Sequence, residues 1–312
     1  MDPADLWRIA HAQGIRLPTK DYWEFIDLIT VQRGQKKSFE EYLALYHWTE
    51  LIQSSPLAVE ESVYSVVGGA YRKANITTLE LRYNPMKRNR GGEQDLDHII
   101  MASVRGLDRA LLEYPVKGGL IFCLDRQFDF AVNEILVEKA IAYRRRGVVG
   151  IDIAGGRNVD FRYRDYATIF RKAKRAGLGI TVHAGEDEGP QSVDEVLRFL
   201  DPDRIGHGIH AAEDPALCKR LAERGILLEI CPTSNLDTAV VSGADELRRF
   251  ITTFRRSKVR FSINTDGPEM LRTTLRDELK AAVRAGFVSK DELRQLGAWA
   301  LEASFVRRTA AS

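Results

Sequence analysis

Cysteine is scarce in this chain and long apolar runs are missing, which excludes two broad classes of protein. The 312 residues contain three cysteines, Cys123, Cys218 and Cys231, which are widely spaced and form no C-x-x-C pair. An odd, scattered set does not suit a disulfide framework and fits a reducing compartment. No run of about 18 apolar residues occurs, and the opening MDPADLWRIA lacks the basic head and apolar core of a signal peptide. The sequence therefore predicts a cytoplasmic protein with no membrane partner.

An excess of charge of either sign is also missing. Lys and Arg number 46 against 44 Asp and Glu, which leaves a net charge of +2. A balanced charge produces no long-range field that would attract a polyanion, so we expect no nucleic-acid partner. A small molecule is the expected partner, and the sequence leaves the oligomeric state open.

The composition is uniform, with 44% apolar residues along the chain and no break between two halves. A chain of this length can bury one large core, so we expect a single domain over residues 1–312. From residue 77 onward, short runs rich in Val, Ile and Leu alternate with segments of helical period, which is typical of βα units around a parallel sheet. The expected strands are 79–85, 119–125, 148–156, 179–186, 204–209, 226–235 and 259–268.

The first 76 residues show helical patterns only, with one helix opening at Asp2 and Pro3 and a longer one, SFEEYLALYHWTELIQ, entered at Ser38. Four Ser or Thr residues stand three places before an acid, as in a capping box that satisfies the free amides of a helix start. The pairs are Ser38/Glu41, Ser192/Glu195, Thr274/Asp277 and Ser289/Glu292.

Seven strands are one fewer than a closed eight-stranded barrel needs to pair both edges of its sheet. We therefore expect an α/β fold of the (β/α)8 TIM type whose first strand is missing from this chain. A barrel that closes with seven strands is the alternative.

Polar residues gather where several expected strands end. His183 and Glu186 follow one strand, His207 the next, and Asp266 the last. Each residue alone has an ordinary structural explanation, since a lone histidine in an apolar strand is usually a hydrogen-bonded core residue and Asp before Gly-Pro is usually a turn residue. Because carboxyl ends of barrel strands meet at one mouth, the coincidence of two histidines and two carboxylates there predicts a shared site.

The ordered motifs HAGE, GHG, CPTSN and NTD-x-P, with an E-x-R-x-x-P strand near residue 80, resemble those of the adenosine deaminase family from about residue 5 to 306. The resemblance implies that His183 and Asp266 bind one Zn²⁺, with Asp266 also part of the catalytic set. It implies that Glu186 protonates a purine ring nitrogen, that His207 orients and helps deprotonate the attacking water, and that the Gly155 amide touches the ring. The implied reaction is hydrolytic deamination of a purine nucleoside or related 6-aminopurine.

The chemistry of these residue types agrees with that reaction. A bound zinc lowers the pKa of its water to about 7, which makes a nucleophile available at neutral pH. Attack at the amino-bearing carbon moves electrons onto a ring nitrogen, and a protonated Glu186 can supply the proton that this nitrogen needs. Ammonia can then leave.

The sequence lacks the H-x-H pair that supplies two further metal ligands on the family's first strand. Its six histidines are His11, His47, His98, His183, His207 and His210. His183 and Asp266 alone would bind metal weakly, because a catalytic metal usually takes three protein ligands or more. The resemblance begins just after the place of H-x-H, so the missing strand and the missing ligands are one deletion. A start placed too late and a genuine loss of metal and activity both remain open.

Two further departures bear on the substrate. Gly267 stands where the family usually has an aspartate that contacts the ring, and Arg157 stands where acidic residues are common. Arg157, with Lys87, Arg88 and Arg90, places positive charge near the barrel mouth, either as a solvated rim or as a site for an anionic group. Three hypotheses follow: a purine nucleoside deaminase, a deaminase for an anionic purine derivative such as aminodeoxyfutalosine or a nucleotide, and a metal-free barrel that serves as a binding module.

Overall fold

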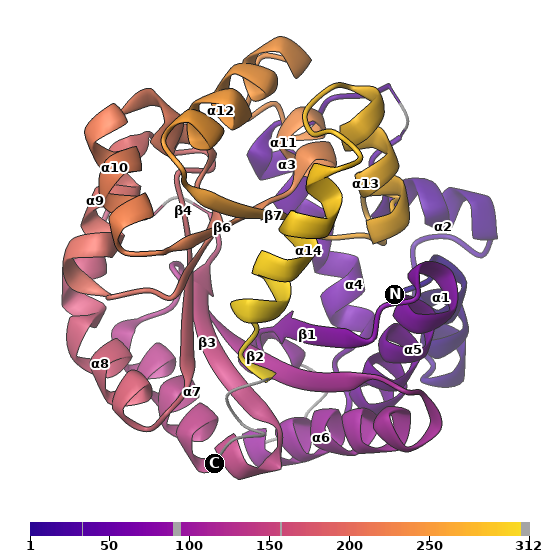
Figure 1. Ribbon diagram of the computed structural model, residues 1–312. Coiled ribbons are helices and arrows are strands. Elements are labelled where there is room, and N and C mark those ends of the chain that lie inside the picture. The colour runs from indigo at the N-terminus through magenta and orange to yellow at the C-terminus, as the bar shows by residue number, and fades with distance from the viewer. Residues whose placement is uncertain (33, 90–94, 157, 307–312) are drawn as a thin grey trace.

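Seven parallel strands form one curled sheet, in the order in which they occur along the chain (Figure 1). The structure is a computed structural model and describes residues 1–32, 34–89, 95–156 and 158–306. The strands are Thr78–Tyr83 (β1), Lys117–Asp125 (β2), Val148–Ala154 (β3), Gly179–Ala184 (β4), Arg204–His207 (β5), Leu227–Ile230 (β6) and Arg260–Ile263 (β7). Each strand begins within two residues of the expected start and ends at or before the expected end. The prediction of a parallel α/β fold is therefore confirmed.

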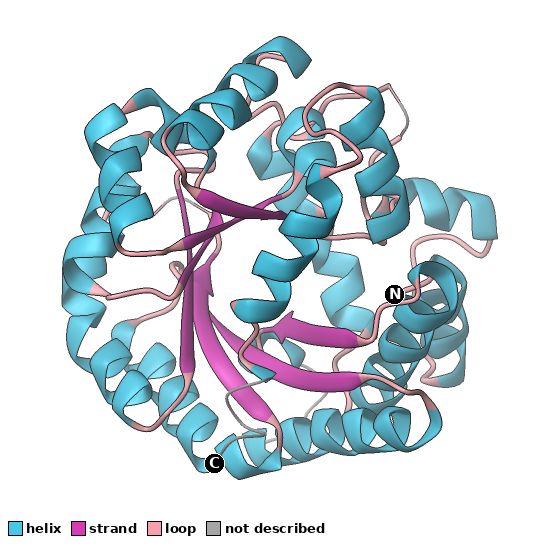
Figure 2. Cartoon of the chain, in the orientation of Figure 1, coloured by secondary structure: helices cyan, strands magenta, loops and turns pink. Residues whose placement is uncertain are grey.

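Helices surround the outside of the sheet, as the cyan ribbons in Figure 2 show. Those before β1 are Pro3–Ala12 (α1), Tyr22–Ile29 (α2), Phe39–Ala44 (α3), Tyr46–Ile52 (α4) and Pro56–Ala74 (α5). Those after it are Leu96–Glu113 (α6), Phe130–Ala142 (α7), Ala167–Arg175 (α8), Pro190–Phe199 (α9), Pro215–Glu223 (α10), Pro232–Asp237 (α11), Ala244–Arg256 (α12), Leu275–Arg284 (α13) and Glu292–Glu302 (α14). No helix in the described ranges is long and apolar enough to cross a membrane.

Three of the four expected caps are present. Ser38 and Glu41 form a reciprocal capping box at α3, Thr274 caps α13, and Ser289 and Glu292 exchange hydrogen bonds at the entry to α14. The expectation for Ser192 is wrong, because α9 already begins at Pro190 and the Ser192 hydroxyl accepts a hydrogen bond from the Gly185 amide instead. The long helix expected from Ser38 is divided at Leu45 into α3 and α4.

The alternation of side chains along β1 explains which of them reach the barrel interior. Leu79, Leu81 and Tyr83 pack against the main hydrophobic core beneath the helices. Because successive side chains of a strand point to opposite faces, Glu80 and Arg82 lie on the inner face. A strand with charged residues on one face and apolar residues on the other thus borders a polar interior.

The sheet stays open between its first and last strands. Each strand pairs with the next from β1 to β7, and the described residues contain no strand between β7 and β1. A (β/α) barrel that is short of one strand is therefore confirmed, and the alternative of a closed seven-stranded barrel is wrong. The segment after α14 covers part of the interior, where Phe305 packs against Gly150 and Gly179 and its amide donates to Glu80 Oε1 at 2.5 Å.

Candidate active site

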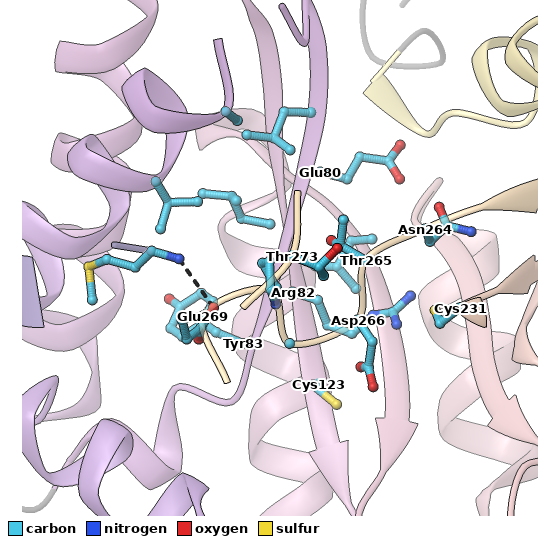
Figure 3. Close-up of a pocket in the computed structure, with 18 of the residues that line it drawn as sticks. Glu80, Arg82, Tyr83, Cys123, Cys231, Asn264, Thr265, Asp266, Glu269 and Thr273 are labelled. Atoms are coloured by element: carbon cyan, nitrogen blue, oxygen red, sulfur yellow. Dashed lines mark hydrogen bonds and ion pairs between the residues drawn. The ribbon is translucent and has the colours of Figure 1, made fainter. Parts of the chain in front are cut away.

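One cavity of about 1210 Å³ is lined by residues of the strands from β1 to β7 and of the helices before β1, and it contains most of the expected site. Six of the seven residues expected there line it: Gly155, His183, Glu186, His207, Asp266 and Gly267. The seventh, Arg157, lies outside the described residues. Figure 3 shows part of the lining, with Glu80, Arg82 and Asp266 among the labelled side chains. The structure thus brings together residues that are distant in sequence.

His183, His207 and Asp266 form the compact centre of this cavity. One potential ligand atom from each lies within 4.8 Å of the others, and the two imidazole rings are 5.4 Å apart. Both His207 and Asp266 have positive φ angles, of 56° and 55°. Residues other than glycine rarely adopt this left-handed conformation, and such strain is concentrated at functional sites.

Asp152 on β3 supports His183 from below and was not recognised in the sequence. Its Oδ2 lies 2.8 Å from His183 Nδ1, and its Oδ1 accepts from the His183 amide at 3.2 Å. Burial alone would raise the pKa of Asp152, but Arg82 and His183 overcome this effect and hold the pKa well below its usual value. An ionised carboxylate beside Nδ1 favours the proton on that nitrogen, which leaves the Nε2 lone pair for the cavity.

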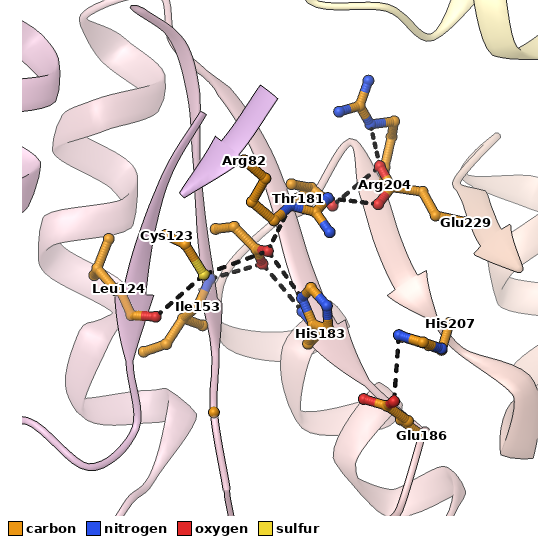
Figure 4. A network of polar contacts seen from close by, with 12 residues as sticks. Arg82, Cys123, Leu124, Ile153, Thr181, His183, Glu186, Arg204, His207 and Glu229 are labelled. Carbon is orange, nitrogen blue, oxygen red and sulfur yellow. Dashed lines mark hydrogen bonds and ion pairs between the residues drawn. The ribbon is translucent and has the colours of Figure 1, made fainter. Parts of the chain in front are cut away.

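An alternating chain of charges continues from Asp152 through the barrel interior (Figure 4). Arg82 contacts Asp152 with Nε at 2.9 Å and Glu229 with Nη2 at 2.6 Å. Arg204 then contacts Glu229 with Nε and Glu80 with Nη1, both at 2.7 Å. Burial would raise the pKa of Glu229, but the two arginines lower it to about 2. Asp152 and each of the four charged side chains beyond it are therefore paired with an opposite charge, as burial requires.

Glu186 and His207 face each other with opposite shifts in pKa. Glu186 Oε1 lies 3.4 Å from His207 Nε2 (Figure 4). Burial raises the pKa of Glu186 well above its usual value, and the charges of Asp266 and Asp187 act in the same direction. Burial lowers the pKa of His207 to about 4. The raised pKa of Glu186 favours a protonated carboxyl, which can donate a proton, and the lowered pKa of His207 favours a neutral imidazole, which can accept one.

Residues of the CPTSN segment and of α3 orient these groups. Ser234 Oγ donates to Asp266 Oδ2 at 2.7 Å, and Tyr42 Oη donates to the same oxygen at 3.2 Å. Asn235 Nδ2 lies 3.0 Å from His207 Nδ1. The sequence indicated the CPTSN motif without assigning roles to Ser234 or Asn235, and it gave no signal that Tyr42 reaches the site.

The donor set fits a divalent metal. Imidazole nitrogen and carboxylate oxygen are the usual ligands of zinc, and three protein ligands are the usual minimum of a catalytic zinc site. The resemblance pointed to His183 and Asp266, and the geometry adds His207 as a potential third ligand. With Oδ2 of Asp266 occupied by two donors, the other carboxylate oxygen is available to an ion.

The cations that were expected near the mouth of the cavity have acidic partners. Lys87 forms an ion pair with Asp125, and Arg88 contacts Glu50 at 3.1 Å and is only 9% exposed. Arg88 is buried and Lys87 is partly exposed, and both are already paired with acids. Arg90, like Arg157, lies outside the described residues. Gly155 has a φ of 101°, and a Cβ there would lie 2.7 Å from Asp125 Oδ1, so this wall requires glycine.

Comparisons with known proteins agree with the geometry. The family model described as adenosine deaminase matches residues 1–311. An adenosine deaminase of Shewanella loihica is 29% identical over 303 residues, which are 96% of this chain and 89% of that protein. Among solved structures, the adenine deaminase of Arthrobacter aurescens has a TM-score of 0.83 at 20% identity and covers 99% of this chain and 94% of its own. The Arabidopsis ADAL protein in complex with IMP has a TM-score of 0.80 at 25% identity, with 98% and 89% covered.

Proposed function

Since the chain belongs to the adenosine deaminase family, we propose that it hydrolyses the amino group from a 6-aminopurine, such as a purine nucleoside, and releases ammonia. The observation that carries this proposal is the pairing of Glu186 with His207 at 3.4 Å, beside His183 and Asp266 in one cavity. The opposite pKa shifts of Glu186 and His207 favour one proton donor beside one proton acceptor.

Each side chain has a role in this reaction. Glu186 donates its proton to a ring nitrogen, so the electron pair displaced from the attacked carbon is neutralised there. Neutral His207 accepts a proton from the water that adds to the carbon. The amino group then leaves as ammonia with the proton that His207 accepted, and the added hydroxyl returns its proton to Glu186 as the carbon becomes a carbonyl. Gly155 offers its backbone amide to the ring, and Asp152 keeps His183 in one tautomer.

His183 and Asp266 would hold the divalent metal that the family uses, and zinc fits their donor atoms. His207 is close enough to be a third ligand, but in this reaction its imidazole is left to accept the proton of the water. When bound, such an ion supplies a Lewis acid that brings the pKa of a water toward neutrality.

A purine with an anionic group is a second candidate substrate. The Arabidopsis ADAL protein, 25% identical, was solved with the nucleotide IMP, which favours a phosphate-bearing ligand. The mouth of the cavity favours a neutral one, because Lys87 and Arg88 are already paired with Asp125 and Glu50. We therefore place a nucleoside first and a nucleotide or a carboxylate-bearing analogue second.

Ammonia release from adenosine, AMP and aminodeoxyfutalosine, measured in parallel with added zinc, tests the proposal. Turnover of at least one substrate, lost on chelation and in the Glu186→Gln variant, is the expected result. The substrate with the highest kcat/KM separates the two candidates. Silence on all three by a folded, zinc-loaded chain would contradict the proposal and favour a binding module.

A further inference from the structure

Two tyrosine hydroxyls lie directly over the backbone of Gly267 on the wall of the active-site cavity. Tyr42 comes from α3 and Tyr46 from the start of α4, and both line the cavity with Glu186 and Asp266. A Cβ at Gly267 would lie 2.5 Å from the Tyr42 hydroxyl and 3.3 Å from the Tyr46 hydroxyl. The absence of a side chain at this position is what makes room for both.

Packing holds the two tyrosines in this position. Tyr42 and Leu45 belong to a small apolar cluster with Met270 and Leu271 of the segment that follows Asp266. The Tyr42 and Tyr46 rings meet edge to face, with centroids 5.8 Å apart. The hydroxyls are therefore presented by a packed helix pair, and their ordering does not have to be supplied by a ligand.

The hydrogen-bonding capacity of the pair is only partly used. Tyr42 donates its proton to Asp266, which as a carboxylate can only accept. For the Tyr46 hydroxyl, the described residues provide one partner, the Tyr42 hydroxyl at 3.4 Å, which is long for an O–H···O bond. A tyrosine hydroxyl keeps its proton at neutral pH, since the ordinary pKa of the phenol is about 10. Tyr46 thus has a proton to donate into the cavity.

We propose that Tyr46 is a specificity-determining residue whose hydroxyl donates a hydrogen bond to a ring nitrogen of the purine, while Tyr42 orients Asp266. The proposal rests on the proposed function for the identity of the ligand as a purine. Glu186 supplies the proton for one ring nitrogen, so Tyr46 recognises a different one. Gly267 has no side chain to compete for that nitrogen, and it allows Tyr46 to approach.

Analogues that replace one ring nitrogen by C–H test this bond, because they keep the shape of the purine and remove the acceptor. The kcat/KM values of adenosine, 3-deazaadenosine and 7-deazaadenosine are measured for the wild type and for Tyr46→Phe. We expect the wild type to prefer adenosine about tenfold over one of the two analogues, as for one neutral hydrogen bond. In Tyr46→Phe that ratio falls to about one, because activity drops on adenosine and is retained on that analogue.

Two matched tyrosine variants separate recognition from structure. Tyr42→Phe removes the bond to Asp266, so it lowers activity on all three substrates and leaves their ratio unchanged. Tyr64→Phe on α5, whose hydroxyl bonds Glu113 at the surface, should change neither activity nor ratio. An unchanged ratio in Tyr46→Phe, or a wild type that does not discriminate between the three compounds, overturns the proposal.

The preference for adenosine over the analogues is also measured in binding. Calorimetry gives the dissociation constants of the three compounds, and their ratio replaces the ratio of kcat/KM values. If the wild type releases no ammonia from any of them, the proposed function fails, while the binding ratio in wild type and Tyr46→Phe still decides the role of Tyr46. Should Tyr46→Phe not fold, Gly267→Ala serves as the second variant. Its Cβ would lie 2.5 Å from the Tyr42 hydroxyl and 3.3 Å from the Tyr46 hydroxyl, so we expect it to shift the pair and to reduce the same ratio.

Discussion

Arg82 is the cation on which two carboxylates of the barrel interior depend, and its replacement by methionine tests the charge network directly. Asp152 is fully buried and the Glu229 side chain is 12% exposed, and Arg82 contacts them at 2.9 and 2.6 Å. Breaking a buried pair costs about 3–5 kcal/mol. Arg82 itself borders the cavity with 28% of its side chain exposed, and each carboxylate keeps a second partner. We therefore expect Arg82→Met to lower the free energy of unfolding by about 2 kcal/mol at pH 7.

The pH dependence of this loss identifies its cause. The pKa of Glu229 is lowered from 4.5 to about 2 in the folded protein, chiefly by Arg82 once the cost of burial is overcome. Its ionisation stabilises the fold above pH 4.5 by about 3 kcal/mol, and this contribution is lost as the pH falls toward 2. Arg82→Met removes much of that contribution at every pH. The difference in unfolding free energy between variant and wild type should therefore become smaller as the pH falls from 5 to 3.

Urea unfolding at these pH values measures the effect. Arg260→Met is the matched control, because Arg260 contacts the exposed Glu302 and should contribute less than about 1 kcal/mol. Two results would refute the network as a source of stability. One is an Arg82→Met protein as stable as the Arg260→Met control. The other is a difference in unfolding free energy between Arg82→Met and wild type that is the same at pH 7 and pH 3.

Three further predictions concern the site and the core. Glu186→Gln should retain metal and lose about 10²–10⁴-fold in kcat, because an amide cannot donate the proton; unchanged turnover would remove Glu186 from the mechanism. In chelator, the wild type should lose about 3 kcal/mol of unfolding free energy between pH 6.5 and pH 4, because in that range only the unfolded state readily protonates His207. The His207→Gln variant should not show this loss. The same pH dependence of unfolding free energy in both proteins would contradict the lowered pKa. Gly179→Ala should cost about 1–3 kcal/mol in thermal unfolding, since its Cβ would lie 2.2 Å from the Phe305 ring, and Phe305→Ala should relieve part of that cost in the double variant; additive losses would exclude this clash.

The order of the strands and the convergence of His183, Glu186, His207 and Asp266 could be predicted from the sequence. Both follow from local patterns, because apolar runs of strand length alternate with helical periods and carboxyl ends of parallel strands meet at one edge. The role of Asp152 could not be predicted in this way. Its position beside His183 depends on how β3 and β4 pair, and that register is not encoded in either strand alone.

Pairing between distant charges also lies beyond local patterns. Lys87 and Arg88 suggested either a solvated rim or a site for an anionic group, because their partners, Asp125 and Glu50, stand elsewhere in the chain and reach them only in the folded state. Tyr42 was expected in a helix and found there, but its contact with Asp266 joins residues 224 positions apart. Sequence patterns predict which residues can do chemistry, and packing decides which of them meet.

The charge network explains how a barrel with an open side keeps its edge strand in place. Among the described strands, β1 has a partner on one side only. Its Arg82 nevertheless reaches Asp152 on β3 and Glu229 on β6, and its Glu80 reaches Arg204 on β5. These contacts cross the interior and connect β1 to strands with which it shares no backbone hydrogen bonds. Because Asp152 also lies against His183, the contacts that hold the edge strand hold a candidate metal ligand as well. A change in Arg82 should therefore alter both the free energy of unfolding and the affinity for metal. If Arg82 only held the edge strand, or only supported His183 through Asp152, one of the two would change without the other.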